Sequence, residues 1–117
     1  RDPFEVTERD GLNCFGDIPE GEFVHILEGL PKSLIDAAEK AKEQTNADET
    51  DPEALLFFDC ISRVLYLEDQ FEQEIESVQI DGIPTVGALT IGEIANNGSG
   101  HLDYYNKTAV VAAADRI

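Results

Sequence analysis

The feature that most constrains this chain is a short run of residues that is apolar on both faces, Ala54-Leu55-Leu56-Phe57-Phe58. A strand with one face in water alternates apolar and polar side chains, whereas a strand covered on both faces reads as a continuous apolar run. We therefore expect this run to be the central buried strand of a sheet. The 117 residues, 42% of them hydrophobic, suffice for one core, so we expect one domain over residues 1–117.

The remaining pattern predicts an α+β fold in the order β-β-β-α-β-α-β-β. We expect a single, predominantly antiparallel sheet of about six strands with two helices packed on it. The strand on each side of the second helix would run parallel if the two are neighbours. Asp10-Gly11 supplies a tight turn for a first hairpin. The other expected elements are strands at 22–27, 85–95 and 108–114 and helices at 32–45 and 69–78.

Charge sets the second constraint. The chain carries 25 acidic and 8 basic residues, a net charge of −17, and no basic cluster. Such a polyanion repels nucleic acid and anionic lipid, and no apolar run approaches the length of a membrane span. Acidic residues spread along the whole sequence are typical of adaptation to molar salt, which screens their repulsion. We therefore expect a halophilic, archaeal source. Because no methionine stands at position 1, we also expect the domain to be cut from a longer protein.

Four clusters contain residues that carry chemistry: Asp59–Arg63, Gly87–Ile94, Tyr104–Thr108 and the two histidines, His25 and His101. Each also has a purely structural interpretation. A cysteine such as Cys60 is more often a small buried side chain than a nucleophile. Glu93 fits a solvated edge carboxylate, a partner of Arg63 or a ligand contact. The tyrosines pack more often than they bind, the acidic helix faces are expected to be solvated, and the histidines do not predict a metal site.

Read in order, these clusters resemble a known family. The run from Phe57 to Arg63 resembles a Phe-x-Cys-x-x-Arg signature, residues 83–95 resemble a second signature that ends in Gly-Glu-Ile, and residues 106–111 resemble a closing Asn-x-Thr strand. Together they resemble the C-terminal FIST domain, from proteins of F-box and intracellular signal transduction. The loop at 16–21 also fits, so the resemblance covers nearly the whole chain. Ser62, Val64 and the pair Ala88-Leu89 depart from the family pattern.

The resemblance implies a cytoplasmic sensory domain that binds a small ligand such as an amino acid, and it implies no catalytic residue, cofactor or metal. Its partners would be an N-terminal FIST domain in the same chain and a signalling output domain such as a histidine kinase. The ligand-binding residues would be Cys60, Arg63, Glu93, Tyr104 and Asn106. Arg63 would grip a ligand carboxylate, because its planar guanidinium matches that group.

Two other functions stay open from the sequence. In the first, the motif residues form an internal network within a structural or protein-interaction module. In the second, Cys60 is the nucleophile of an enzyme with a histidine as base, which requires that base within hydrogen-bond reach. All three hypotheses depend on whether Cys60, Arg63, Glu93 and Asn106 meet at one end of the sheet.

Overall fold

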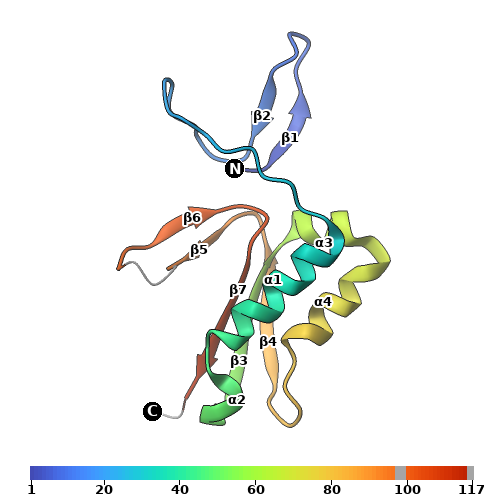
Figure 1. Cartoon of the computed structure of the whole chain (residues 1–117), viewed down its shortest axis with the longest axis vertical. Helices are drawn as coiled ribbons and strands as arrows, with labels where there is room; N and C mark the ends of the chain where they lie inside the picture. Colours follow the sequence, from blue (N-terminus) through green and yellow to red (C-terminus); the bar gives the residue numbers. More distant parts are fainter. Residues whose placement is uncertain (97–99, 116–117) are drawn as a thin grey trace.

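The predicted central strand lies in the middle of a three-stranded sheet (Figure 1). The structure, a computed structural model, describes residues 1–96 and 100–115. Strand β3 (Ala54–Cys60) runs parallel to β4 (Thr85–Thr90) and antiparallel to β7 (Ala109–Ala114). The α+β class, the place of β3 and the parallel pair across the second helical region are all confirmed.

Two helices cover one face of this sheet. Helix α1 (Pro31–Glu43) and helix α4 (Phe71–Val78) pack against each other, and α1 also packs on β7. The core forms where Ala38 of α1 and Val78 of α4 meet Phe57 of β3. Between β3 and α4 the chain forms α3 (Ile61–Leu67) and a 3₁₀ turn, η1 (Glu68–Gln70), and a short helix α2 (Ala47–Thr50) precedes β3.

The opposite face of the sheet is uncovered within the described part of the chain. Successive side chains of a strand alternate between faces, and paired residues share a face. Since Phe57 points to the helices, Leu56 and Phe58 point away from them, together with their register partners on β4 and β7. This open face consists of Leu56, Phe58, Val86, Ala88, Val110 and Ala112.

The expected single sheet of six strands is wrong, because the strands form three separate sheets. Strand β1 (Pro3–Val6) pairs with β2 (Leu12–Cys14) in the predicted hairpin, and Asp10 takes the positive φ of its turn. A second hairpin joins β5 (Glu93–Ala95) to β6 (Asp103–Tyr105). The strands of these two short hairpins pair only with each other and not with a strand of the central sheet. The hairpins therefore stand apart from that sheet (Figure 1).

The predicted long strand at 85–95 is broken into β4 and β5. A glycine is required at Gly92 and at Gly87 for different physical reasons. At Gly92 the backbone turns with a φ of +92°, a conformation that favours glycine, and the chain leaves the central sheet there. At Gly87 a side chain would run into the carbonyl oxygen of Phe57 on β3. The close backbone approach predicted from these glycines is therefore confirmed at Gly87.

The predicted strand at 22–27 is also wrong, although its residues have strand-like character. This stretch has no regular structure, and Phe23 and Ile26 are 102% and 98% exposed. Its alternating apolar pattern is a local signal, but a strand forms only where a neighbouring strand offers hydrogen-bond partners. Within the described residues no such neighbour is present.

The second helical region begins earlier than expected, at Ile61 instead of Asp69, and one of its acidic residues is not solvated. The acidic helix faces are expected to be solvated, yet the side chain of Glu74 in α4 is fully buried. A buried carboxylate needs a counter-charge, and Arg63 of α3 provides it.

Candidate functional site

Polar groups from distant segments meet at the carboxyl end of β3. Cys60 closes β3 and pairs in register with Thr90 at the end of β4. The amide of Cys60 also donates to the carbonyl of Thr108, which directly precedes β7. The parallel β4 ends and the antiparallel β7 begins at this edge, so residues some 30 and 48 positions after Cys60 are brought beside it.

Arg63 is the most connected side chain of this region. Its Nε lies 3.1 Å from Asp59 Oδ1, and one Nη bonds to Glu74 Oε1. The same Nη donates to the carbonyl of Leu34 in α1 at 2.8 Å, and the other donates to the carbonyl of Lys107 at 3.4 Å. The ion pair considered between Arg63 and Glu93 does not form. We call Asp59, Arg63 and Glu74 the Arg63 network; all three are buried.

The Arg63 network holds two carboxylates against one cation, which affects the protonation of Asp59. Burial, the largest cause, and the Glu74 charge together raise the pKa of Asp59 from its ordinary 3.8 to about 7, while Arg63 acts in the opposite direction. Two like charges in a dry site cannot both ionise without penalty. A proton on Asp59 would leave one carboxylate and one guanidinium, which compensate each other.

Glu93 is buried beside the Arg63 network but has a different partner. Its Oε1 accepts a hydrogen bond of 2.7 Å from the hydroxyl of Thr90, and its Oε2 has no hydrogen-bond partner among the described residues. Only 3% of the residue is exposed. A buried carboxylate oxygen without a donor is costly, so Oε2 is a place where a donor from another molecule would be stabilised.

Tyr104 and Asn106 form a second group, on the other side of the β5–β6 hairpin. Tyr104 pairs with Ile94 and so faces away from Glu93, which pairs with Tyr105. The Asn106 amide donates to the Tyr104 hydroxyl at 3.1 Å, while its Oδ1 is buried without a partner in the described structure. The guanidinium of Arg1 lies 5.0 Å from the centre of the Tyr104 ring. The proposed binding residues thus converge at one end of the sheet, but in two groups.

Cys60 is buried, and its Sγ lies 3.2 Å from the Ser62 hydroxyl. The histidines are placed elsewhere: His25 lies in the exposed stretch after β2, and His101 is paired with Asp103. Cys14 and Cys60 are both free thiols. In the described ranges no group of histidine, cysteine and carboxylate side chains is arranged to hold a metal ion.

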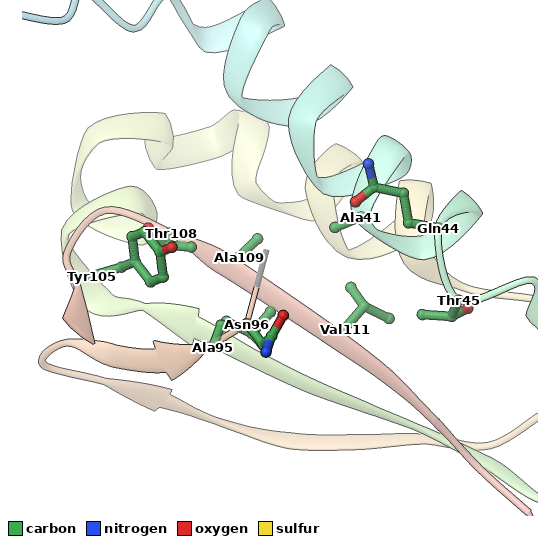
Figure 2. A pocket seen from close by; sticks show the side chains of 10 residues that line it. Ala41, Gln44, Thr45, Ala95, Asn96, Tyr105, Thr108, Ala109 and Val111 are labelled. Carbon is green, nitrogen blue, oxygen red and sulfur yellow. The ribbon is translucent and has the colours of Figure 1, made fainter. Parts of the chain in front are cut away.

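A pocket of about 390 Å³ lies next to this region, between α1, β5 and β7 (Figure 2). Gln44 and Thr45 stand at one end of it and Tyr105 and Thr108 at the other, with Asn96 between them. Small apolar side chains complete the lining: Ala41, Ala95, Ala109, Val110 and Val111. The volume suits a small molecule, and the lining carries no formal charge.

The residues that line this pocket were not predicted as binding residues from the sequence. The sequence analysis named Tyr104, whereas Tyr105 lines the pocket. The hydroxyl of Tyr105 donates to Asp103 at 3.3 Å. Desolvation and the Asp103 charge raise the pKa of Tyr105 above its ordinary value. Which of the two tyrosines faces the pocket depends on the pairing of β5 with β6, because neighbouring residues of a strand point to opposite faces. That pairing was not predicted from the sequence.

Ala95 and Glu93 leave β5 on the same face, two residues apart, so the pocket continues the Glu93 side of the site. The fold and site thus define an α+β domain that gathers polar groups, buried acceptors and a small pocket at one end of a sheet. The family model of the FIST C domain matches residues 1–96, and this chain belongs to that family, whose members are sensory domains of signal transduction. No curated protein and no solved structure matches the chain significantly. No helix in residues 1–96 and 100–115 is long and apolar enough to cross a bilayer.

Proposed function

We propose that this domain is a cytoplasmic sensor that binds a small polar ligand, such as an amino acid, at the carboxyl end of β3. The observation that carries the proposal is Glu93 Oε2, one of several buried polar atoms without a hydrogen-bond partner among the described residues. It lies on the face of β5 that leads to the pocket of about 390 Å³. Unsatisfied buried acceptors are rare in folded proteins and often mark the place of a missing partner.

Each residue of the proposed site then has a role. Glu93 accepts from the ammonium group of the ligand. Asn106 and Tyr104, on the other side of the β5–β6 hairpin, would contact the part of the ligand that extends past the hairpin. Cys60 shapes the wall. Arg63 binds the ligand carboxylate by replacing its longest contact, the 3.4 Å bond to the Lys107 carbonyl, while it keeps Asp59 and Glu74. A ligand bound in this way would release the backbone at Lys107, which leads into β7.

Such a release connects the site to the rest of the molecule. The same guanidinium also bonds to the Leu34 carbonyl of α1, so a change in its contacts would reach both the helix layer and the sheet. We propose that an N-terminal FIST domain completes the site and that an output domain such as a histidine kinase responds to it.

An alternative function follows from the same network. Four groups already contact Arg63, which is what a structural or protein-interaction module without its own ligand would require. The two functions differ in one measurable way. A structural module gains no stability from any small molecule, whereas a sensor gains RT ln(1 + [L]/Kd).

The test is calorimetry on the chain, alone and joined to an N-terminal FIST domain, with a panel of amino acids and their amides. We expect at least one amino acid to bind, and Glu93→Gln to weaken it by about tenfold or more, since a charged acceptor contributes about 1.5–3 kcal/mol. Lys32→Ala, on the exposed face of α1, is the control and should bind as the parent does. If no member of the panel binds either form, the ligand proposal fails and the structural alternative gains support.

A further inference from the structure

A segment of the chain is folded against nothing although it is strongly apolar. In residues 22–27, Phe23 and Ile26 are fully exposed, Leu27 is 87% exposed and Val24 is 63% exposed. We call this stretch the 22–27 segment. Single exposed apolar residues are ordinary, but four within five consecutive residues are typical of an interaction site. The radius of gyration, 15.7 Å, exceeds the roughly 13 Å of a compact chain of this length, in keeping with parts that project from the body.

The same chain presents an unpaired sheet edge. Strand β4 is an outer strand that pairs only with β3 within the described structure, so the other row of its backbone N–H and C=O groups has no strand partner. Its sequence, Thr-Val-Gly-Ala-Leu-Thr, contains neither a charge nor a proline. Natural edge strands are normally protected by such residues. Val86 and Leu89 are about half exposed there, at 54% and 49%.

We propose that two copies of this chain form a dimer in which the 22–27 segment of each copy adds as a strand to the outer edge of β4 of the other. Addition of an extended segment to an open edge satisfies backbone groups on both sides. In a strand, Val24 and Ile26 would lie on one face and Phe23 and Leu27 on the other. One of these pairs would then continue the open face beside Val86.

We expect the partner at the β4 edge to be a second copy of this chain, because each copy carries both the open edge and the 22–27 segment. In a dimer with a two-fold axis, the 22–27 segment pairs with the β4 edge twice, once in each direction between the copies. Two weak pairings that act together are far stronger than one. The edge of β7 is a poorer acceptor, since β5 and the pocket lie beside it. The inference is independent of the proposed ligand.

Charge determines when this dimer forms. The two ranges that would pair carry one carboxylate, Glu22, but each copy has a net charge of −17. At low ionic strength the two bodies repel each other, whereas in molar salt the Debye length falls to about 3 Å and the apolar contact dominates. We therefore expect a dimer in molar salt that dissociates as the salt is removed.

Sedimentation equilibrium in about 2 M KCl tests the proposal with two variants and a matched control. Ile26→Lys alters the segment, Val86→Lys alters the β4 edge, and Leu65→Lys makes the same charge change at an exposed apolar residue of α3. We expect each of the first two to raise the dimer dissociation constant by about tenfold or more, and Leu65→Lys to leave it unchanged. Circular dichroism checks that all three fold.

Mixing the two dimer-breaking variants gives the sharpest outcome. The Ile26→Lys chain keeps an intact edge and the Val86→Lys chain an intact segment, so the mixture retains one of the two pairings. It should therefore form a 1:1 complex that is tighter than the dimer of either variant alone. A parent chain that stays monomeric at about 100 μM in molar salt would overturn the proposal. So would a dimer that tolerates Ile26→Lys, or two folded variants that fail to associate when mixed.

Discussion

The Nε of Arg63 in α3 lies 3.1 Å from Oδ1 of Asp59 near the end of β3, and both side chains are buried. This contact joins the last residues of β3 to the first turn of α3. Glu74 of α4 binds the same guanidinium from the opposite helix. The Arg63 network therefore connects the sheet to both helical segments that follow it, at the edge where the candidate site lies.

Removal of the cation should destabilise the domain strongly. Arg63→Met leaves Asp59 and Glu74 buried without a counter-charge, which we expect to lower the free energy of unfolding by about 3–5 kcal/mol. Urea denaturation measures this. Lys32→Met breaks an exposed ion pair with Asp36 and should cost no more than about 1 kcal/mol. Equal effects of the two substitutions would show that the network does not hold the fold.

The pKa of Asp59 predicts how stability depends on pH. In the folded state this pKa is raised to about 7 from 3.8, so the native protein holds a proton that the unfolded chain releases. The stabilising contribution is fully present below pH 3.8 and is lost as the pH rises through 7. We expect a loss on the order of 2 kcal/mol between pH 5 and pH 8, allowing for solvent screening.

Asp59→Asn supplies the comparison for this pH dependence, because its side chain does not titrate. The free energy of unfolding of the variant should vary less between pH 5 and pH 8 than that of the parent, at constant salt. Identical slopes for the two proteins would mean that Asp59 is ionised in the folded state throughout.

Gly87 should not tolerate any side chain. An added Cβ would collide with the carbonyl oxygen of Phe57, so Gly87→Ala must push β4 away from β3. We expect a loss of about 2 kcal/mol or more in thermal or urea unfolding. Ala88→Val, at the next position and on the open face, serves as the control and should change stability little. A fully stable Gly87→Ala protein would contradict the close pairing of the two strands.

The net charge predicts that folding requires salt. With 25 acidic and 8 basic residues, self-repulsion should expand or unfold the chain below about 0.1 M salt, where the Debye length reaches about 10 Å. Small-angle scattering along a KCl series measures this expansion. Sucrose at the same osmolality should not replace KCl, because it does not screen charge. A chain that keeps its dimensions and stability without salt would argue against halophilic adaptation.

Local patterns predicted β3, α1 and the first hairpin, whereas the strand predicted at 22–27 is wrong and the one predicted at 85–95 is broken in two. The apolar run of β3 favoured a central place in the sheet, the pattern at 32–45 favoured a helix, and Asp10-Gly11 favoured a turn. The parallel arrangement of β3 and β4 also followed, since a helix-containing crossover favours it. The family, too, followed from short motifs in order, and the family match over residues 1–96 confirms it.

Partners in space were not predictable in the same way. Glu74 has the sequence context of a solvated helix residue, and its burial depends on Arg63, which precedes it by 11 positions on another helix. The 22–27 segment has a strand pattern, but no strand lies beside it. Tyr105 and not Tyr104 reached the pocket because the β5–β6 pairing sets which residue faces it.

The sequence by itself thus determined the central strand β3, the first hairpin, the helix α1, the strong negative charge and the family, because periodicity, turn chemistry and composition act over a few residues. Only the tertiary structure decided that Arg63 forms ion pairs with Asp59 and Glu74. It also decided that Glu93 and Asn106 have buried oxygens without donors among the described residues, and that the outer edge of β4 has no strand partner there. The reason is physical: desolvation, ion pairing and strand pairing depend on distances between segments, and only the assembled fold sets those distances.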